Sequence, residues 1–151
     1  MKRSVLLICL LCCCGNFVLA QNEITIGYTS DTNFIITASL DELEVDWERQ
    51  LATQELKSEL NDWKVIKGSD GNEDYYLLIA TNDQGSLKMA SRLKLDGTKL
   101  ILTQSGSKTE KVLVCHGCAD GCEPHILEGN LVCSKCEVSG RCTKVTIVNS
   151  K

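Results

Sequence analysis

The sequence predicts an α+β protein, in which an antiparallel sheet is covered by one long amphipathic helix and is followed by a small disulfide-rich β module. Three observations support this prediction. Apolar and polar residues alternate with period two along most of the chain, the period changes once to helical spacing, and six cysteines gather near the C-terminus.

The first 20 residues have the three-part anatomy of a secretory signal peptide. The basic pair Lys2-Arg3 precedes an apolar run over 5–14, and compact residues at 18–20 end at the expected cleavage site. This apolar stretch is shorter than the ~20 residues that span a bilayer. We therefore expect residues 1–20 to be removed on export, which leaves no membrane span in the mature chain.

The predicted location is outside the cytoplasm, either secreted or periplasmic. The alternative is a lipoprotein that carries its lipid on Cys14. Cys13 then stands where lipoproteins normally carry Ala, Gly or Ser, so the sequence favours cleavage without lipid anchoring.

The mature chain is acidic. Without Lys2 and Arg3, 14 basic residues stand against 20 acidic ones, a net charge of −6. Nucleic acids and anionic membranes are bound through clustered Lys and Arg, and no such cluster is present. The composition argues against nucleic acid as a partner. It identifies no partner, and a protein or a cell-surface ligand is one hypothesis.

The mature chain is expected to open with a hairpin. Residues 23–29 alternate apolar and polar side chains, the polar stretch 29–33 has turn chemistry, and 34–39 forms a second apolar strand pattern. The sequence predicts two antiparallel strands here.

Helical spacing begins at Leu40, and one amphipathic helix is predicted over about 40–61. Ser39, followed three residues later by Glu42, predicts a capping box at its start. Its apolar stripe consists of Leu40, Leu43, Trp47, Leu51, Ala52, Leu56 and Leu60. We expect this stripe to face the sheet and the acidic side chains to face water.

Four further strands are predicted, over 63–67, 75–81, 87–95 and 99–103. Asp96-Gly97 is a strong two-residue hairpin signal between the last two of these. Their polar side chains form a modest basic face, which we expect to be the solvent side of the sheet: Lys88, Arg92, Lys94 and Lys99.

The polar loop over 104–109 is the best domain boundary in the chain. The predicted organisation is a signal peptide at 1–20, an α+β domain at 21–107 and a cysteine-rich module at 108–151. Short strand patterns lead into and out of this module.

The module holds two CxxC pairs, each followed by one further cysteine. In an oxidising compartment an even number of cysteines predicts disulfides, here three, because the segment has few large apolar residues with which to pack a core. Sequence alone does not choose among the fifteen pairings. The six residues are Cys115, Cys118, Cys122, Cys133, Cys136 and Cys142.

Two other uses of these cysteines stay open. One is a zinc site, because the two CxxC pairs resemble a zinc ribbon with Cys115, Cys118, Cys133 and Cys136 as ligands. The other is thiol redox chemistry at a CxxC pair, although the chain lacks a thioredoxin-type context around either pair. The leading prediction includes no cofactor, with zinc as its alternative.

No catalytic constellation stands out. His116 and His125 are the only histidines, both lie among the cysteines, and no nucleophile-elbow motif is present. The sequence favours an exported, non-enzymatic binding or structural protein, and the alternative is a zinc-binding or thiol-redox protein. The expected contact surface lies on the loops 117–125 and 134–141, because small crosslinked modules display rigid loops.

Overall fold

The computed structural model describes residues 22–30, 33–106 and 108–149. The predicted signal peptide and its cleavage site lie outside these residues. No helix in the described part of the chain is long and apolar enough to cross a membrane.

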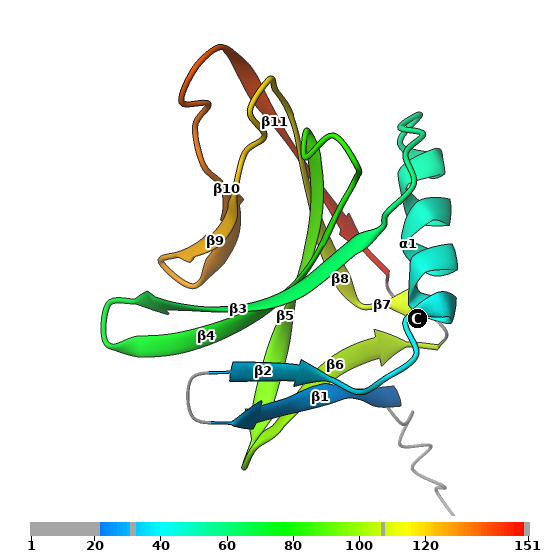
Figure 1. Cartoon of the computed structure of the whole chain (residues 1–151), viewed down its shortest axis with the longest axis vertical. Coiled ribbons are helices and arrows are strands. Elements are labelled where there is room, and N and C mark those ends of the chain that lie inside the picture. The colour runs from blue at the N-terminus through cyan, green and yellow to red at the C-terminus, as the bar shows by residue number, and fades with distance from the viewer. Residues whose placement is uncertain (1–21, 31–32, 107, 150–151) are drawn as a thin grey trace, which may run out of the picture.

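The fold is built around one nine-stranded antiparallel sheet, with a separate two-stranded hairpin beside it (Figure 1). The strands are β1 (Asn22–Ser30), β2 (Asn33–Ile36), β3 (Asp62–Asp70), β4 (Glu73–Thr81), β5 (Leu87–Asp96), β6 (Lys99–Ser105), β7 (Lys108–Thr109), β8 (Lys111–Cys118), β9 (Pro124–Leu127), β10 (Asn130–Cys133) and β11 (Gly140–Val148). The single helix among the described residues is α1 (Asp41–Thr53).

Strand β5 connects the two parts of the sheet. Residues 88–93 pair with β4 along one edge. On the other edge, residues 87–90 pair with β8 and residues 94–96 pair with β6. The β8 and β6 partners therefore separate beside the middle of β5, at about Ser91. This separation shapes the outer surface of the sheet at that point.

The predicted α+β class is wrong, because the structure is mostly β, with 60% strand and 10% helix. The helix is also much shorter than the predicted span 40–61. The backbone N–H groups of Gln54, Glu55 and Leu56 turn back to carbonyls of the last helical turn, and Glu55 has a φ of 60°. A side-chain-bearing residue in this left-handed conformation ends a right-handed helix.

Leu56 and Leu60 fit the spacing of the predicted helical stripe, although neither lies in the helix. Leu60 is fully buried and Leu56 is half-buried, but both lie in the irregular segment that leads into β3. They pack against the same core as the helix. The predicted capping box is also absent, since the helix N-cap is Leu40 and no side chain caps it.

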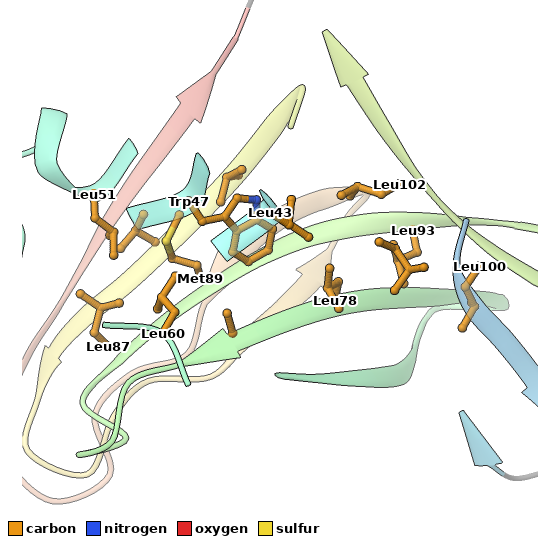
Figure 2. Close-up of a cluster of buried hydrophobic side chains, with 14 residues drawn as sticks. Leu43, Trp47, Leu51, Leu60, Leu78, Leu87, Met89, Leu93, Leu100 and Leu102 are labelled. Atoms are coloured by element: carbon orange, nitrogen blue, oxygen red, sulfur yellow. The ribbon is translucent and has the colours of Figure 1, made fainter. Parts of the chain in front are cut away.

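The main core lies between α1 and the inner face of the sheet (Figure 2). Trp47 is its largest fully buried side chain, and its ring centroid lies 5.0 Å from that of Trp63. The Trp47 Nε1–H donates a hydrogen bond of 2.8 Å to Thr109 Oγ1, and the Thr109 N–H donates one of 3.2 Å to Asp46 Oδ2. These bonds attach the helix to β7.

A second core covers the outer face of β4, β5 and β8. The β9–β10 hairpin lies on the side of the sheet away from α1 (Figure 1), and Ile126 and Leu131 pack from it against Leu77 and Ile79 of β4. Strands β8 and β11 lie beyond the predicted boundary at residue 107, yet both belong to the main sheet. The division into two domains stays a prediction.

Candidate functional site

The six cysteines of the C-terminal region form three disulfides, as their number predicts. Cys115 bonds to Cys133, Cys118 to Cys136 and Cys122 to Cys142. The first two bonds join β8 to the end of β10 and to the segment that follows, and the third joins the turn after β8 to the start of β11. The disulfides therefore hold the β9–β10 hairpin against the sheet, and such bonds are typical of oxidising extracellular environments.

The four predicted zinc ligands are two disulfides in this structure, so none is the thiolate that zinc binds. The Cys118–Cys136 and Cys122–Cys142 disulfides lie close together, because the sulfurs of Cys118, Cys122 and Cys142 all lie within 4.8 Å of one another. The zinc and thiol-redox alternatives therefore require a reduced form of the protein.

One residue of the predicted basic face is not exposed to solvent. The side chain of Lys88 is only 9% exposed and forms a salt bridge with Glu123, which is 58% exposed. The prediction placed Lys88 on the solvent side, but the cysteine-rich segment covers this end of β5. The bridge is a second attachment between that segment and the sheet.

We expect Glu123→Gln to lower the free energy of unfolding by about 2 kcal/mol, because it leaves the buried Lys88 ammonium without its carboxylate. Urea denaturation measures the loss. Glu137→Gln is the matched control, since Glu137 is exposed and forms no salt bridge in the described part of the chain. An unchanged midpoint for Glu123→Gln would show that the buried ammonium does not depend on this partner.

A surface hollow lies where β6 and β8 separate beside β5. It has a volume of about 720 Å³ and opens to solvent beside the β9–β10 hairpin. We call it the β5 cleft. Its lining comprises Asp74, Tyr75, Tyr76, Ser91, Arg92, Leu93, Lys94, Leu95, Thr103, Glu110, Lys111, Ile126, Gly129 and Leu131.

Two cations from neighbouring strands, Arg92 and Lys111, line the β5 cleft. Ala90 of β5 and Leu113 of β8 are paired and share the outer face of the sheet. Arg92 and Lys111 lie two residues beyond this pair on their strands, which places them on the same face. Both are exposed, and neither forms a salt bridge with a described residue.

The remaining charges around the β5 cleft are largely paired. Lys94 lies 3.5 Å from Glu23, and Asp74 lies 2.6 Å from Lys67. The hydrogen bond from Lys67 to Asp74, together with the charge of that carboxylate, raises the pKa of Lys67 above its ordinary value of 10.5. Asp74 therefore faces its own hairpin partner and does not neutralise Arg92 or Lys111.

The Lys67–Asp74 pair predicts a pH dependence. Because folding raises the pKa of Lys67, the stabilisation is fully present below pH 10.5 and is lost as the pH rises through the folded value. Asp74→Asn is expected to bring the pKa of Lys67 back toward its ordinary value, as measured by NMR titration of the lysine side chain. Asp70→Asn, in the same hairpin, is the control and should leave it unchanged.

The hairpin tip is tied to the sheet beside the β5 cleft. The N–H of Gly129 donates a hydrogen bond of 2.6 Å to Asp70 Oδ2, at the end of β3. With Ile126 and Leu131 packed against β4, this bond holds the hairpin in place as a wall. The disulfides secure its other end.

The loops that the sequence predicted as a contact surface lie elsewhere. Residues of 117–125 and 134–141 line a hollow of about 700 Å³ next to the segment 56–59, and 134–141 also borders a smaller one of about 410 Å³ beside the disulfides. His116 lines the first of these hollows, and His125 Nδ1 lies 3.2 Å from the carbonyl oxygen of Glu123. Neither histidine lines the β5 cleft.

Sequence reasoning missed the β5 cleft, although it singled out Arg92 and Lys94 as part of a basic face. Lys111, Tyr75 and Ile126 had no signal that would group them with these cations. They are brought together only by the pairing of β5 with β4 and β8 and by the fold-back of the hairpin.

Comparison of the chain with protein families, with curated proteins and with solved structures found no match.

Proposed function

We propose that this chain is an exported, non-enzymatic binding protein whose ligand site is the β5 cleft. The observation that carries the proposal is the cleft itself, a hollow of about 720 Å³ with basic and aromatic residues on its floor and apolar residues on its wall. Small-molecule sites in proteins have volumes of about 300–1,000 Å³ and combine apolar walls with a few polar groups.

The disulfides support this proposal because they give the cleft a fixed wall. A hairpin of two four-residue strands is marginal on its own in water. Here Cys115–Cys133 anchors it to β8, while the Lys88–Glu123 bridge attaches the segment before it to β5. A wall held in place before the ligand arrives reduces the ordering cost of binding.

The lining of the β5 cleft favours binding over catalysis. Its polar side chains are Ser, Thr, Tyr, Arg, Lys, Asp and Glu, and it contains neither a cysteine nor a histidine. The hydroxyl of Ser91 donates a hydrogen bond of 2.8 Å to the carbonyl oxygen of Lys111, so it is not paired with a general base.

The first test concerns export and the state of the cysteines. Expressed with its full N-terminus, the chain should be recovered outside the cytoplasm, beginning at Gln21 and about 6 Da lighter than the fully reduced mass. Alkylation after denaturation should modify no cysteine. Modification of four or more cysteines, or recovery of the uncleaved chain from the cytoplasm, would contradict the proposal and favour the zinc or thiol-redox alternative.

The second test concerns the cleft. A set of anionic, neutral and cationic small molecules is screened for a rise in the unfolding temperature of residues 21–151 and of Thr103→Trp, which places an indole in the cleft. Thr146→Trp is the control, because Thr146 is exposed on β11 and does not line the cleft. Ligands should stabilise the unchanged protein and the control, but not Thr103→Trp. Equal stabilisation of Thr103→Trp, or none by any compound, would contradict the proposal.

A further inference from the structure

We infer that the β5 cleft selects small molecules that join one carboxylate to an apolar body. This inference rests on the proposed function, because it names the ligand class of the same site. Three features of the cleft support it: two cations on neighbouring strands without acidic partners among the described residues, a lining with a small positive charge, and an apolar wall on the hairpin side.

The cations provide the recognition of the charged group. Arg92 and Lys111 lie on the same face of neighbouring strands and have no salt-bridge partner in the described part of the chain. A guanidinium binds a carboxylate through two parallel hydrogen bonds, and a neighbouring ammonium adds a compact charge. An anion that lies between the two side chains replaces the acidic partner that both lack.

The charge of the lining favours a single negative charge on the ligand. Arg92, Lys94 and Lys111 contribute three positive charges, and Asp74 and Glu110 contribute two negative ones, a sum of +1. A monoanion balances this charge. A phosphate with two negative charges would leave an excess of negative charge beside the half-buried Glu110.

The apolar wall provides the recognition of the ligand's body. Ile126 and Leu131 are opposite one another in the hairpin, so both point toward the sheet, and Tyr75 lies beneath them in the same buried cluster. Arg92 pairs with Leu77, two residues from Tyr75 on β4. A ligand whose carboxylate lies at Arg92 therefore meets this apolar group on the hairpin side.

The volume of the cleft fits a ligand with a small body. Gly129 at the hairpin tip lines the cleft and is bonded to Asp70 of β3, which holds the wall at that end. A volume of about 720 Å³ accommodates a ring system or a short alkyl chain.

The experiment compares two nearly isosteric probes, 2-naphthoate and its neutral amide, 2-naphthamide, by calorimetric titration into residues 21–151. We expect the carboxylate to bind at least about tenfold more tightly than the amide at low ionic strength. The difference should shrink as salt is added, because screening weakens the charge interaction. In Arg92→Gln/Lys111→Gln the preference should disappear.

Lys64→Gln is the matched control, because Lys64 is an exposed cation of β3 that does not line the cleft. This variant should keep the preference for the carboxylate. A preference that persists in Arg92→Gln/Lys111→Gln, or one that Lys64→Gln also abolishes, would overturn the assignment of these two cations.

The remaining outcomes separate this inference from the proposed function. If both probes bind equally and Thr103→Trp abolishes their binding, the cleft is a binding site but the inference of a carboxylate ligand is wrong. If neither probe binds while other compounds stabilise the protein through the cleft, the inference is wrong as well. If no compound acts through the cleft, both fail.

Discussion

Replacing Trp47 by alanine is expected to lower the free energy of unfolding by about 3–5 kcal/mol, the largest single effect that we predict. Trp47 is fully buried between α1 and the sheet, in contact with the core that also holds Leu51 and Met89 (Figure 2). The substitution removes the indole, leaves a cavity, and deprives the Thr109 hydroxyl of its 2.8 Å hydrogen bond. Small domains are stable by only about 5–15 kcal/mol, so the variant is close to unfolding.

Urea denaturation followed by circular dichroism measures this effect. If Trp47→Ala does not fold, Trp47→Phe gives the answer, because it keeps most of the packing and loses the hydrogen bond, at a cost of about 1–2 kcal/mol. Val45→Ala on the same helix is the control, since Val45 is 55% exposed. A cost below about 1 kcal/mol for Trp47→Ala would mean that α1 does not pack on the sheet as described.

Removing the Cys115–Cys133 disulfide by replacing both residues with alanine is expected to cost about 3 kcal/mol or more. The bond closes a loop of 18 residues, and loop closure of this size contributes about 3 kcal/mol. Cys115 is also fully buried in the second core, so packing is lost as well. The hairpin wall should loosen, and binding of any ligand in the β5 cleft should weaken with it.

The Cys118–Cys136 disulfide provides a matched comparison, because it also has a sequence separation of 18. Its removal by the same substitutions should cost a similar amount in loop closure. It should affect ligand binding less, since neither cysteine lies in the strands of the hairpin. Intact mass verifies that the other two disulfides remain. Unchanged stability after removal of Cys115–Cys133 would contradict the role given to this bond.

Local patterns predicted the strands well where neighbouring residues determine them. The N-terminal hairpin is confirmed by the pairing of β1 with β2. A two-residue turn does join β5 to β6, but it consists of Gly97 and Thr98, because Asp96 is the last residue of β5 and pairs with Lys99. The turn between the predicted strands 63–67 and 75–81 is shorter in the structure than the polar stretch that separates them. Ser69 pairs with Asp74 and Asp70 with Glu73, so polar residues continue the hairpin to its exposed end.

The helix prediction failed because apolar spacing alone does not separate a helix from a buried irregular segment. Leu56 and Leu60 fit the helical stripe, yet Glu55 turns the chain before them and they enter the core from outside the helix. The predicted α+β class was wrong because it depended on this long helix. The prediction also placed a covering element on only one face of the sheet. The outer face holds its own core under the hairpin.

The candidate site depends on contacts that no local pattern encodes. Lys88 and Arg92 lie on the same face of β5, and the sequence pattern predicts that both are exposed to solvent. In the structure one is buried against Glu123 and the other is exposed in the cleft. The difference follows from how far the cysteine-rich segment extends over β5. That extent depends on the disulfide pairing, which the spacing of the cysteines leaves open.

The most direct test of the central claim is an amide ¹H–¹⁵N NMR titration of residues 21–151 with 2-naphthoate. The account predicts that the shifted amides cluster around the β5 cleft, on Tyr75, Arg92, Lys111, Ile126 and Leu131. It also predicts little change on α1 or on the loop 134–141. Shifts that centre on that loop or on the helix, with the cleft residues unchanged, would contradict the claim that the disulfide-held hairpin and β5 form the ligand site.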